Sequence, residues 1–451
     1  MTFLETIVYN LLENKETISF YVPFLLTTCV ILTGLGVFST KRLMLIIVII
    51  SFFLPWEDCH RLWQGCLSSN VYFLMAILAT SHIIKDSLLV KKGIYFVLYH
   101  LASKPKLVDK ILFFTGIFLT PILTAQSARI AVMTPVLGSL FEHKIIRETP
   151  KAAEAMLHTT FCGCILLSTV FLSGKSSNYL LLNMLTNEQA LPNGWLSWLF
   201  FASFTGLLLL AVFFFIHGHY YKPANYPTIN RFTLLRSMAN LPANSFQEST
   251  SLLMLACLLP GMLLMLCLGV STIPLSIIII FLPILTGVKP YQQLHTLINL
   301  PFICYLIAMV GTMNLINKLD VTLFDTTKYS LVTAWIKDPL YCMVGVFLLS
   351  WGLNFVLGTM TAPALAFTLL MPILPTSPVH PWIIIFTILM ASEAWIFPYQ
   401  SSYFNLFQSQ IGSYRQCSLN RLIKSNVFMA FFKFLVLLAS IPFWKAIGIY
   451  P

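Results

Sequence analysis

Residues 196–217 read LSWLFFASFTGLLLLAVFFFIH, an apolar run without a single Asp, Glu, Lys or Arg. A helix needs about 20 such residues to cross the hydrocarbon core of a bilayer. Seven further candidate spans occur along the chain, at residues 19–38, 43–55, 70–84, 251–269, 274–288, 297–316 and 427–447. Of the 451 residues, 58% are hydrophobic and only 10% charged, whereas soluble globular proteins carry about 25% charged residues. The sequence therefore predicts an all-α integral membrane protein.

Four other apolar stretches are interrupted by polar or helix-breaking residues. In chain order the breaks lie at 124–127 within 111–141, at 174–178 within 155–185, at 358–363 within 339–375 and at 398–402 within 382–411. Each half of the chain thus shows three spans, a broken hairpin, a broken helix and a final span. Interrupted segments at matching positions of two halves are typical of the binding site of a secondary transporter.

This order predicts about ten transmembrane helices plus two re-entrant hairpins. We assign residues 1–217 to a first repeat with an inner hairpin, and residues 251–451 to a second repeat with an outer hairpin. A polar linker, 218–250, joins them on the cytoplasmic side. Each half makes five full crossings, an odd number, so the second repeat is expected to be inverted relative to the first.

Positive charge predicts the orientation. With both termini on the non-cytoplasmic side, the cytoplasmic loops hold eighteen Lys and Arg residues and the opposite loops hold six. The reverse orientation would oppose the positive-inside bias of membrane proteins. The short loops and the chain length favour a bacterial inner membrane.

The net charge of +11 does not indicate a nucleic-acid partner, because the basic residues lie in short loops between apolar runs. The histidines form no His-x-x-x-His or Glu-x-x-His pair, so we predict no metal site. No phosphate-binding glycine loop occurs, which argues against an ATP-driven pump.

Arg129, Lys175 and Glu393 are charged residues within or beside interrupted apolar stretches. A charge at membrane depth is costly and usually pairs or serves a function. We interpret Arg129 and Lys175 as fixed positive charges that face an anionic substrate, although a structural ion pair or snorkelling explains them too. Glu393 is either a proton or ion carrier or a structural partner for one of these cations.

Neutral residues at the breaks are the other candidate substrate ligands. They are Gln126, Ser127, Ser176, Ser177, Asn178, Thr359, Thr361, Pro363, Gln400, Ser401 and Ser402. Ordinary hydrogen bonding between helices is the alternative explanation for each of them. Their clustering at all four breaks favours a shared cavity.

The breaks resemble those of the divalent anion/sodium symporter family, which carries di- and tricarboxylates or sulfate. In that family a Ser-Asn-Thr motif at each hairpin tip precedes a short helix ending in Pro. The segment 125–135 (AQSARIAVMTP) fits this frame, and 174–178 (GKSSN) keeps the Gly and Asn of the family's Gly-Thr-Pro-Pro-Asn turn. In the second half, 360–372 resembles the second hairpin tip, and 397–402 (FPYQSS) is similar to a Phe-Pro-Tyr-Gln-Ser turn.

This resemblance implies alternating access of a small anion, a homodimer in the lipid bilayer, sodium as the only ion cofactor, and no enzymatic activity. Neither Ser-Asn-Thr motif is intact, however, and two cations stand where the first sodium site would be. We therefore hypothesise that Arg129, with Lys175, replaces that sodium ion, so that the protein is an exchanger or couples to fewer sodium ions. One sodium site can remain near Thr361, Gln400 and Ser401.

Two other function classes are open from the sequence. A membrane-embedded lipid-modifying enzyme would need clustered acids or histidines near one interface, and the acids here are dispersed. A membrane partner or assembly protein that kept the fold and lost its ligands would also explain the altered motifs.

Overall fold

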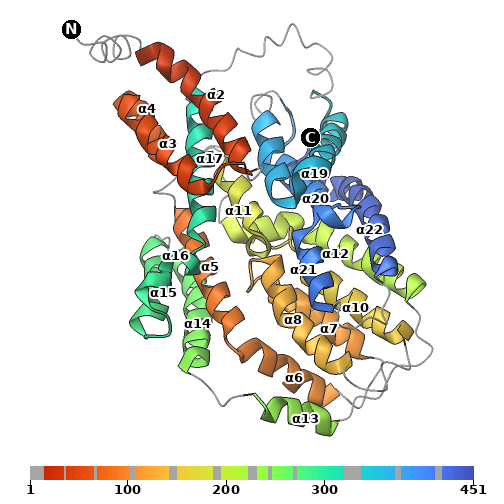
Figure 1. Cartoon of the computed structure of the whole chain (residues 1–451). Coiled ribbons are helices and arrows are strands. Elements are labelled where there is room, and N and C mark those ends of the chain that lie inside the picture. The colour runs from red at the N-terminus through yellow and green to blue at the C-terminus, as the bar shows by residue number, and fades with distance from the viewer. Residues whose placement is uncertain are drawn as a thin grey trace.

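The computed structural model describes most of the chain. The described residues are 15–34, 37–64, 69–101, 107–141, 150–185, 194–221, 231–241, 246–267, 272–318, 337–370, 377–411 and 419–451. Within them every regular element is helical (Figure 1), which confirms the predicted fold class.

The helices of the first half of the chain begin at α2 and end at α12. They are α2 (Lys15–Gly34), α3 (Thr40–Phe53), α4 (Trp56–Trp63), α5 (Ser69–Asp86), α6 (Leu89–Leu101), α7 (Val108–Leu119), α8 (Gln126–Phe141), α10 (Pro150–Ile165), the 3₁₀ turn η3 (Leu172–Gly174), α11 (Ser176–Asn183) and α12 (Gly194–Tyr220).

The remaining helices begin with a short one between the halves. They are α13 (Arg231–Ala239), α14 (Phe246–Cys267), α15 (Ile273–Leu285), η5 (Tyr291–Gln293), α16 (Leu294–Leu297), α17 (Leu300–Lys318), α19 (Pro339–Leu370), α20 (Pro381–Ser392), η7 (Pro398–Gln400), α21 (Ser402–Ile411), α22 (Asn420–Ala439) and α23 (Ile441–Ala446). The segment 218–250, predicted as a linker, therefore contains α13, the end of α12 and the start of α14.

All eight candidate spans contain a helix. In the described part of the chain, three helical segments are long and apolar enough to cross a bilayer: Gly194–Tyr220, Pro339–Leu357 and Asn420–Ala446. Two bent helix pairs each pass the same test together: α5 with α6, bent by 60°, and 291–297 with 300–316, bent by 55°. The segment that follows the candidate span 70–84 is thus also helical, because α6 continues from α5 after the sharp bend.

The helices form two groups (Figure 1). In one group α17 packs against α2, α3 and α4, and α15 packs against α5 and α14. In the other, α7 packs along α10, α19 along α20, α8 along α21 and α12 along α22. Helix α6 contacts α5 of the first group and α7 and α8 of the second, so it joins the two.

Glycine permits the close approach of α7 and α10. A Cβ atom on Gly116 would lie 2.5 Å from the carbonyl carbon of Gly163, and one on Gly163 would lie 2.5 Å from the carbonyl oxygen of Phe113. Real Cβ atoms do not come this near to backbone, so only glycine fits at either position. This contact fixes the broken hairpin against the first half of the broken helix.

Three of the four predicted breaks are breaks in the structure. Helices α7 and α8 are separated at 120–125, α10 and α11 at 166–175, and α20 and α21 at 393–401. The second and last of these each contain a 3₁₀ turn, η3 and η7, so corresponding segments of the two halves are built alike.

The prediction of a break at 358–363 was wrong. Helix α19 runs from Pro339 to Leu370 with Pro363 inside it. Proline has no N–H, so the carbonyl oxygen of Thr359, four residues earlier, loses its helical donor. The ammonium group of Lys175 lies 3.3 Å from that oxygen and donates to it, and so supplies the donor that the proline removes.

Candidate functional site

Glu393 lies at the centre of the converging breaks. It caps the C-terminus of α20, at the start of the last break, and its side chain is only 3% exposed. Its Oε1 accepts hydrogen bonds from Lys175 Nζ at 2.6 Å and Gln126 Nε2 at 3.0 Å, and its Oε2 accepts one from the Tyr403 hydroxyl at 3.0 Å. The carboxylate thus joins both breaks of the first half to the last break of the second.

Lys175 is held by groups from the second half of the chain. It occupies the extended residue just before α11, so its side chain leaves the break of the first broken helix. Its Nζ approaches Glu393 Oε1, the Thr359 carbonyl at 3.3 Å and Ser392 Oγ at 3.4 Å. The two halves are therefore tied together by a buried ion pair, which agrees with the structural-pair alternative for Lys175 and Glu393.

A second lysine completes this cluster. Lys433 lies within α22, is 6% exposed, and donates to the backbone carbonyl of Glu393 at 2.7 Å. That carbonyl is at the end of α20, where the helix supplies no donor. Lys433 thus satisfies a carbonyl that the break has freed.

Arg129 likewise donates to backbone carbonyls at breaks, here in the first half of the chain, and it binds four of them. It lies in the first turn of α8 and is completely buried. Its guanidinium nitrogens donate to five neutral oxygens, namely Cys164 O (2.6 Å), Thr120 O (3.3 Å), Leu123 O (2.5 Å), Gly174 O (2.9 Å) and Ser168 Oγ (2.7 Å). These oxygens come from the hairpin break and from the break between α10 and α11.

The prediction that Arg129 faces a substrate is therefore not supported by this arrangement. The side chain is buried among carbonyl groups, each of its three nitrogens donates to the protein, and none of the acceptors is a carboxylate. The positive charge of Arg129 lies close to both breaks. Its N–H groups, however, donate to oxygens of the two breaks and so join them.

The break before α11 is built around a glycine and an amide. A Cβ on Gly174 would lie 2.5 Å from the Ser168 carbonyl oxygen, so a side chain cannot fit there. Asn178 Nδ2 donates to the carbonyls of Ser168 and Phe171, at 2.8 and 2.9 Å. Asn178 Oδ1 and Ser177 Oγ are buried without a partner among the described residues, so they are available to a ligand.

Ser176 and Ser127, the other two serines predicted at the breaks of the first half, differ in exposure. Ser176, the first residue of α11, is buried beside the unpartnered Ser177. Ser127, in the first turn of α8, is exposed. Of the pair Gln126 and Ser127, the structure brings only Gln126 to Glu393.

The turn between α20 and α21 is held by Gln400. Its Oε1 accepts from the backbone N–H groups of Ile396 and Phe397, and its Nε2 donates to the Asn354 carbonyl at 3.2 Å. Ser401 Oγ accepts from the N–H of Phe404 and so caps α21. These side chains stabilise the turn, and Ser402 beside them is exposed.

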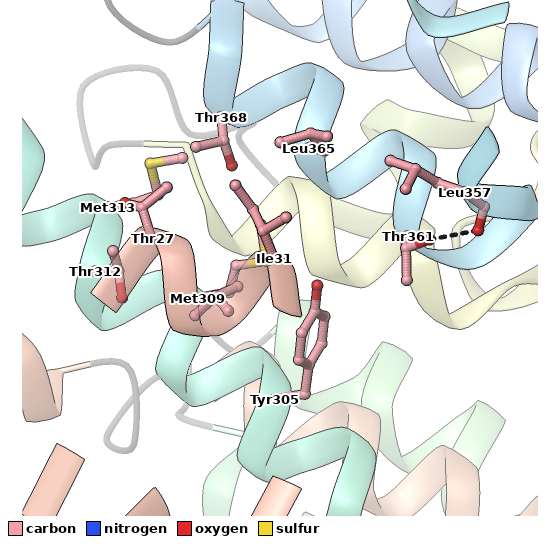
Figure 2. Close-up of a pocket in the computed structure, with 11 residues that line it drawn as sticks. Thr27, Ile31, Tyr305, Met309, Thr312, Met313, Leu357, Thr361, Leu365 and Thr368 are labelled. Carbon is pink, nitrogen blue, oxygen red and sulfur yellow. Dashed lines mark hydrogen bonds between the residues drawn. The ribbon is translucent and has the colours of Figure 1, made fainter. Parts of the chain in front are cut away.

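Thr361 lies away from this turn, contrary to its predicted grouping with Gln400 and Ser401. It lines a cavity of about 20 Å³ between α2, α17 and α19 (Figure 2), and its hydroxyl donates to the Leu357 carbonyl at 2.6 Å. A cavity of this size holds about one water molecule, which is too small for an organic anion. Pro363, two residues along the same helix, is buried, and its missing N–H leaves the carbonyl of Thr359 without a helical donor.

The charges at the breaks do not balance. Among the described residues there, Arg129, Lys175 and Lys433 are buried cations and Glu393 is the buried acid. The other buried acids of the described residues lie elsewhere: Asp109 Oδ2 pairs with His217 at 3.2 Å, Glu248 pairs with Lys92 at 2.9 Å, and Asp58 is in α4. Removing an ion from water costs several kcal/mol, so two uncompensated positive charges favour the entry of an anion.

A family model for the sodium:sulfate symporter transmembrane region matches residues 8–293. The chain belongs to the sodium:sulfate symporter family. It is therefore a multi-pass membrane transporter rather than an enzyme, and the resemblance of its motifs to this family is confirmed. A comparison with curated proteins found no match.

Membership of the sodium:sulfate symporter family indicates that the substrate is a small anion and that sodium is the co-transported ion of the family. Arg129 lies inside the matched region, whereas Glu393 and Lys433 lie beyond its end. The central cluster thus combines the family region with a C-terminal part that the match does not cover.

Two members of this cluster were not among the predicted site residues. Lys433 interrupts the apolar run 427–447, so its position at membrane depth was a usable signal. Tyr403 follows the turn 397–402 and carries no signal of its own, because tyrosine is common in membrane helices.

Proposed function

We propose that this chain carries small dianions, di- or tricarboxylates above all, by alternating access. The observation that supports this most strongly is the pair of uncompensated positive charges at the breaks. A dianion would neutralise both of them at membrane depth, whereas a neutral solute would leave the cost of burying them in place.

Exchange, or coupling to fewer sodium ions than in a typical symporter, follows from Arg129. Carbonyls freed at the breaks of discontinuous helices are the groups that coordinate sodium in secondary transporters. Here the carbonyls of Thr120, Leu123, Cys164 and Gly174 accept hydrogen bonds from the Arg129 guanidinium. We infer that a tethered cation provides the charge that a sodium ion would otherwise bring.

In the second half, too, oxygens that could coordinate sodium already accept hydrogen bonds from the protein. The Glu393 carbonyl accepts from Lys433, and Gln400 Oε1 accepts from two backbone N–H groups. A remaining sodium ion would have to bind near Gln400 and Ser401 without Thr361, which lines a different cavity.

Lys175 is the residue that we assign to direct substrate contact. A substrate carboxylate can replace Glu393 as its partner, with Ser176, Ser177 and Asn178 beside it. Glu393 would then be buried without Lys175, a setting that favours its protonated form. Proton coupling through Glu393 is therefore a second candidate for the driving force.

The test is counterflow in proteoliposomes. Vesicles loaded with unlabelled succinate should accumulate external labelled succinate without a sodium gradient, with sodium equal on both sides. A series in which N-methyl-D-glucamine replaces sodium gives the number of sodium ions required, and an absolute requirement for two or more would reject the replacement of sodium by Arg129. An external pH series in the same assay would identify proton coupling.

A fold that has lost transport is the alternative. Thermal unfolding in the presence of dicarboxylates, citrate, sulfate and phosphate separates the two, because a ligand that binds the native state raises the unfolding temperature. Stabilisation by one class of anion supports transport, and stabilisation by none supports an assembly partner. We further propose a homodimer in a bacterial inner membrane, with both termini on the non-cytoplasmic side.

A further inference from the structure

A crevice of about 700 Å³ lies between the two groups of helices. It is lined by the end of α5, by α6 and α7, and by α14. The lining residues are Ile84, Leu89, Val90, Gly93, Ile94, Val97, Leu107, Lys110, Ile111, Phe114, Thr115, Phe118, Leu119, Ile122, Leu252 and Leu255. Its volume is in the range of about 300–1,000 Å³ that small-molecule sites occupy.

The lining is apolar apart from Thr115 and Lys110. Phe118 and Phe114 are 70% and 52% exposed, and Leu252 is 53% exposed, so the crevice opens to the surroundings of the protein. In a membrane-spanning chain these surroundings are lipid. A dianion would lose its hydration in such a crevice without gaining partners, which excludes the substrate as its occupant.

One end of the crevice is charged. Lys110 is exposed in the first turn of α7, and no hydrogen bond or ion pair of its ammonium group occurs among the described residues. Beside the crevice, Lys92 of α6 is paired with Glu248 in the first turn of α14, at 2.9 Å. Of the described residues that line the crevice, Lys110 is the cation, and it is suited to an anionic group whose apolar part extends along the crevice.

We propose that this crevice is a lipid site, which holds an acyl chain of an anionic glycerophospholipid with its phosphate at Lys110. Apolar length and the cation of Lys110 at one end match an acyl chain and a headgroup. Two nearby acids of the described residues are engaged elsewhere: Glu248 pairs with Lys92, and Asp109, which precedes Lys110, is buried and pairs with His217. Because α14 belongs to one helix group, α7 to the other, and α6 joins them, a lipid here contacts both groups at their junction.

Gly93 provides a direct test of this proposal. A Cβ on Gly93 meets no atom within 4 Å, so Gly93→Phe fills the crevice without displacing the backbone. Gly352 of α19 also has open space around its Cβ and is exposed, yet it does not line the crevice. Gly352→Phe is therefore the matched control.

The experiment is native mass spectrometry of the purified full chain, incubated with equal amounts of phosphatidylglycerol and phosphatidylcholine. We expect one phosphatidylglycerol to be retained by the wild type and by Gly352→Phe, and retention to fall at least tenfold in Gly93→Phe. Lys110→Gln should keep a bound lipid but reduce the preference for phosphatidylglycerol by about fivefold, the contribution of one basic side chain at a membrane surface.

Equal retention by wild type and Gly93→Phe would contradict the site, as would a wild type that retains no lipid. An unchanged preference in Lys110→Gln would contradict the assigned position of the phosphate. Circular dichroism and the unfolding temperature of each variant establish that it is folded, so that a loss of lipid reports on the crevice itself.

Discussion

Arg129, Lys175 and Lys433 show how single residues complete the breaks in these helices. Each donates to a carbonyl that lacks a helical donor, whether because a helix ends or because Pro363 removes an N–H. A buried carbonyl without a donor costs about 1–3 kcal/mol, so these cations stabilise the breaks as well as charging them.

The ion pair of Lys175 and Glu393 gives the first prediction at this scale. Removal of one partner of a buried pair leaves an unpaired charge and typically costs about 3–5 kcal/mol, whereas replacement of both by apolar residues costs far less. Lys175→Met alone should therefore lower the unfolding temperature more than the double variant Lys175→Met/Glu393→Met. Thermal unfolding in detergent measures this, and an additive effect of the two substitutions would argue against the pair.

Arg129→Ala gives the second prediction. Loss of the guanidinium frees four backbone carbonyls and one hydroxyl, so the variant should be destabilised by at least about 3 kcal/mol. If the guanidinium replaces a sodium ion, sodium should partly restore the unfolding temperature of the variant while leaving the wild type unchanged. N-methyl-D-glucamine at the same ionic strength is the control, and equal responses to the two salts would reject the replacement.

At the scale of elements, the breaks depend on how closely α7 and α10 approach each other. Gly163→Ala should destabilise the protein, because the added methyl group overlaps the Phe113 carbonyl and overpacking costs about 1–3 kcal/mol or more. Gly218→Ala, in α12, meets no atom within 4 Å and should leave stability unchanged or raised. Comparison of the two unfolding temperatures tests the helix contact, and equal values would contradict it.

At the scale of the whole molecule, hydropathy was sufficient to predict the all-α fold, a helix within each of the eight candidate spans and three of the breaks, because lipid exposure dictates apolar composition. The hydrogen-bonding partners of the buried cations were harder to predict. The Thr359 carbonyl, which Pro363 leaves without a helical donor, accepts instead from Lys175, 184 positions away, and no local pattern encodes such a contact. The acceptors of Arg129 were likewise not predictable, since four of them are backbone carbonyls whose positions only the folded chain defines.

The dependence of succinate affinity on sodium concentration tests the central claim, that tethered cations supply charge that sodium ions would otherwise bring. The slope of the logarithm of the binding constant against the logarithm of sodium concentration, at constant ionic strength, gives the number of sodium ions taken up with the substrate. The three buried cations predict a slope between zero and one. A slope of two or more would contradict the account.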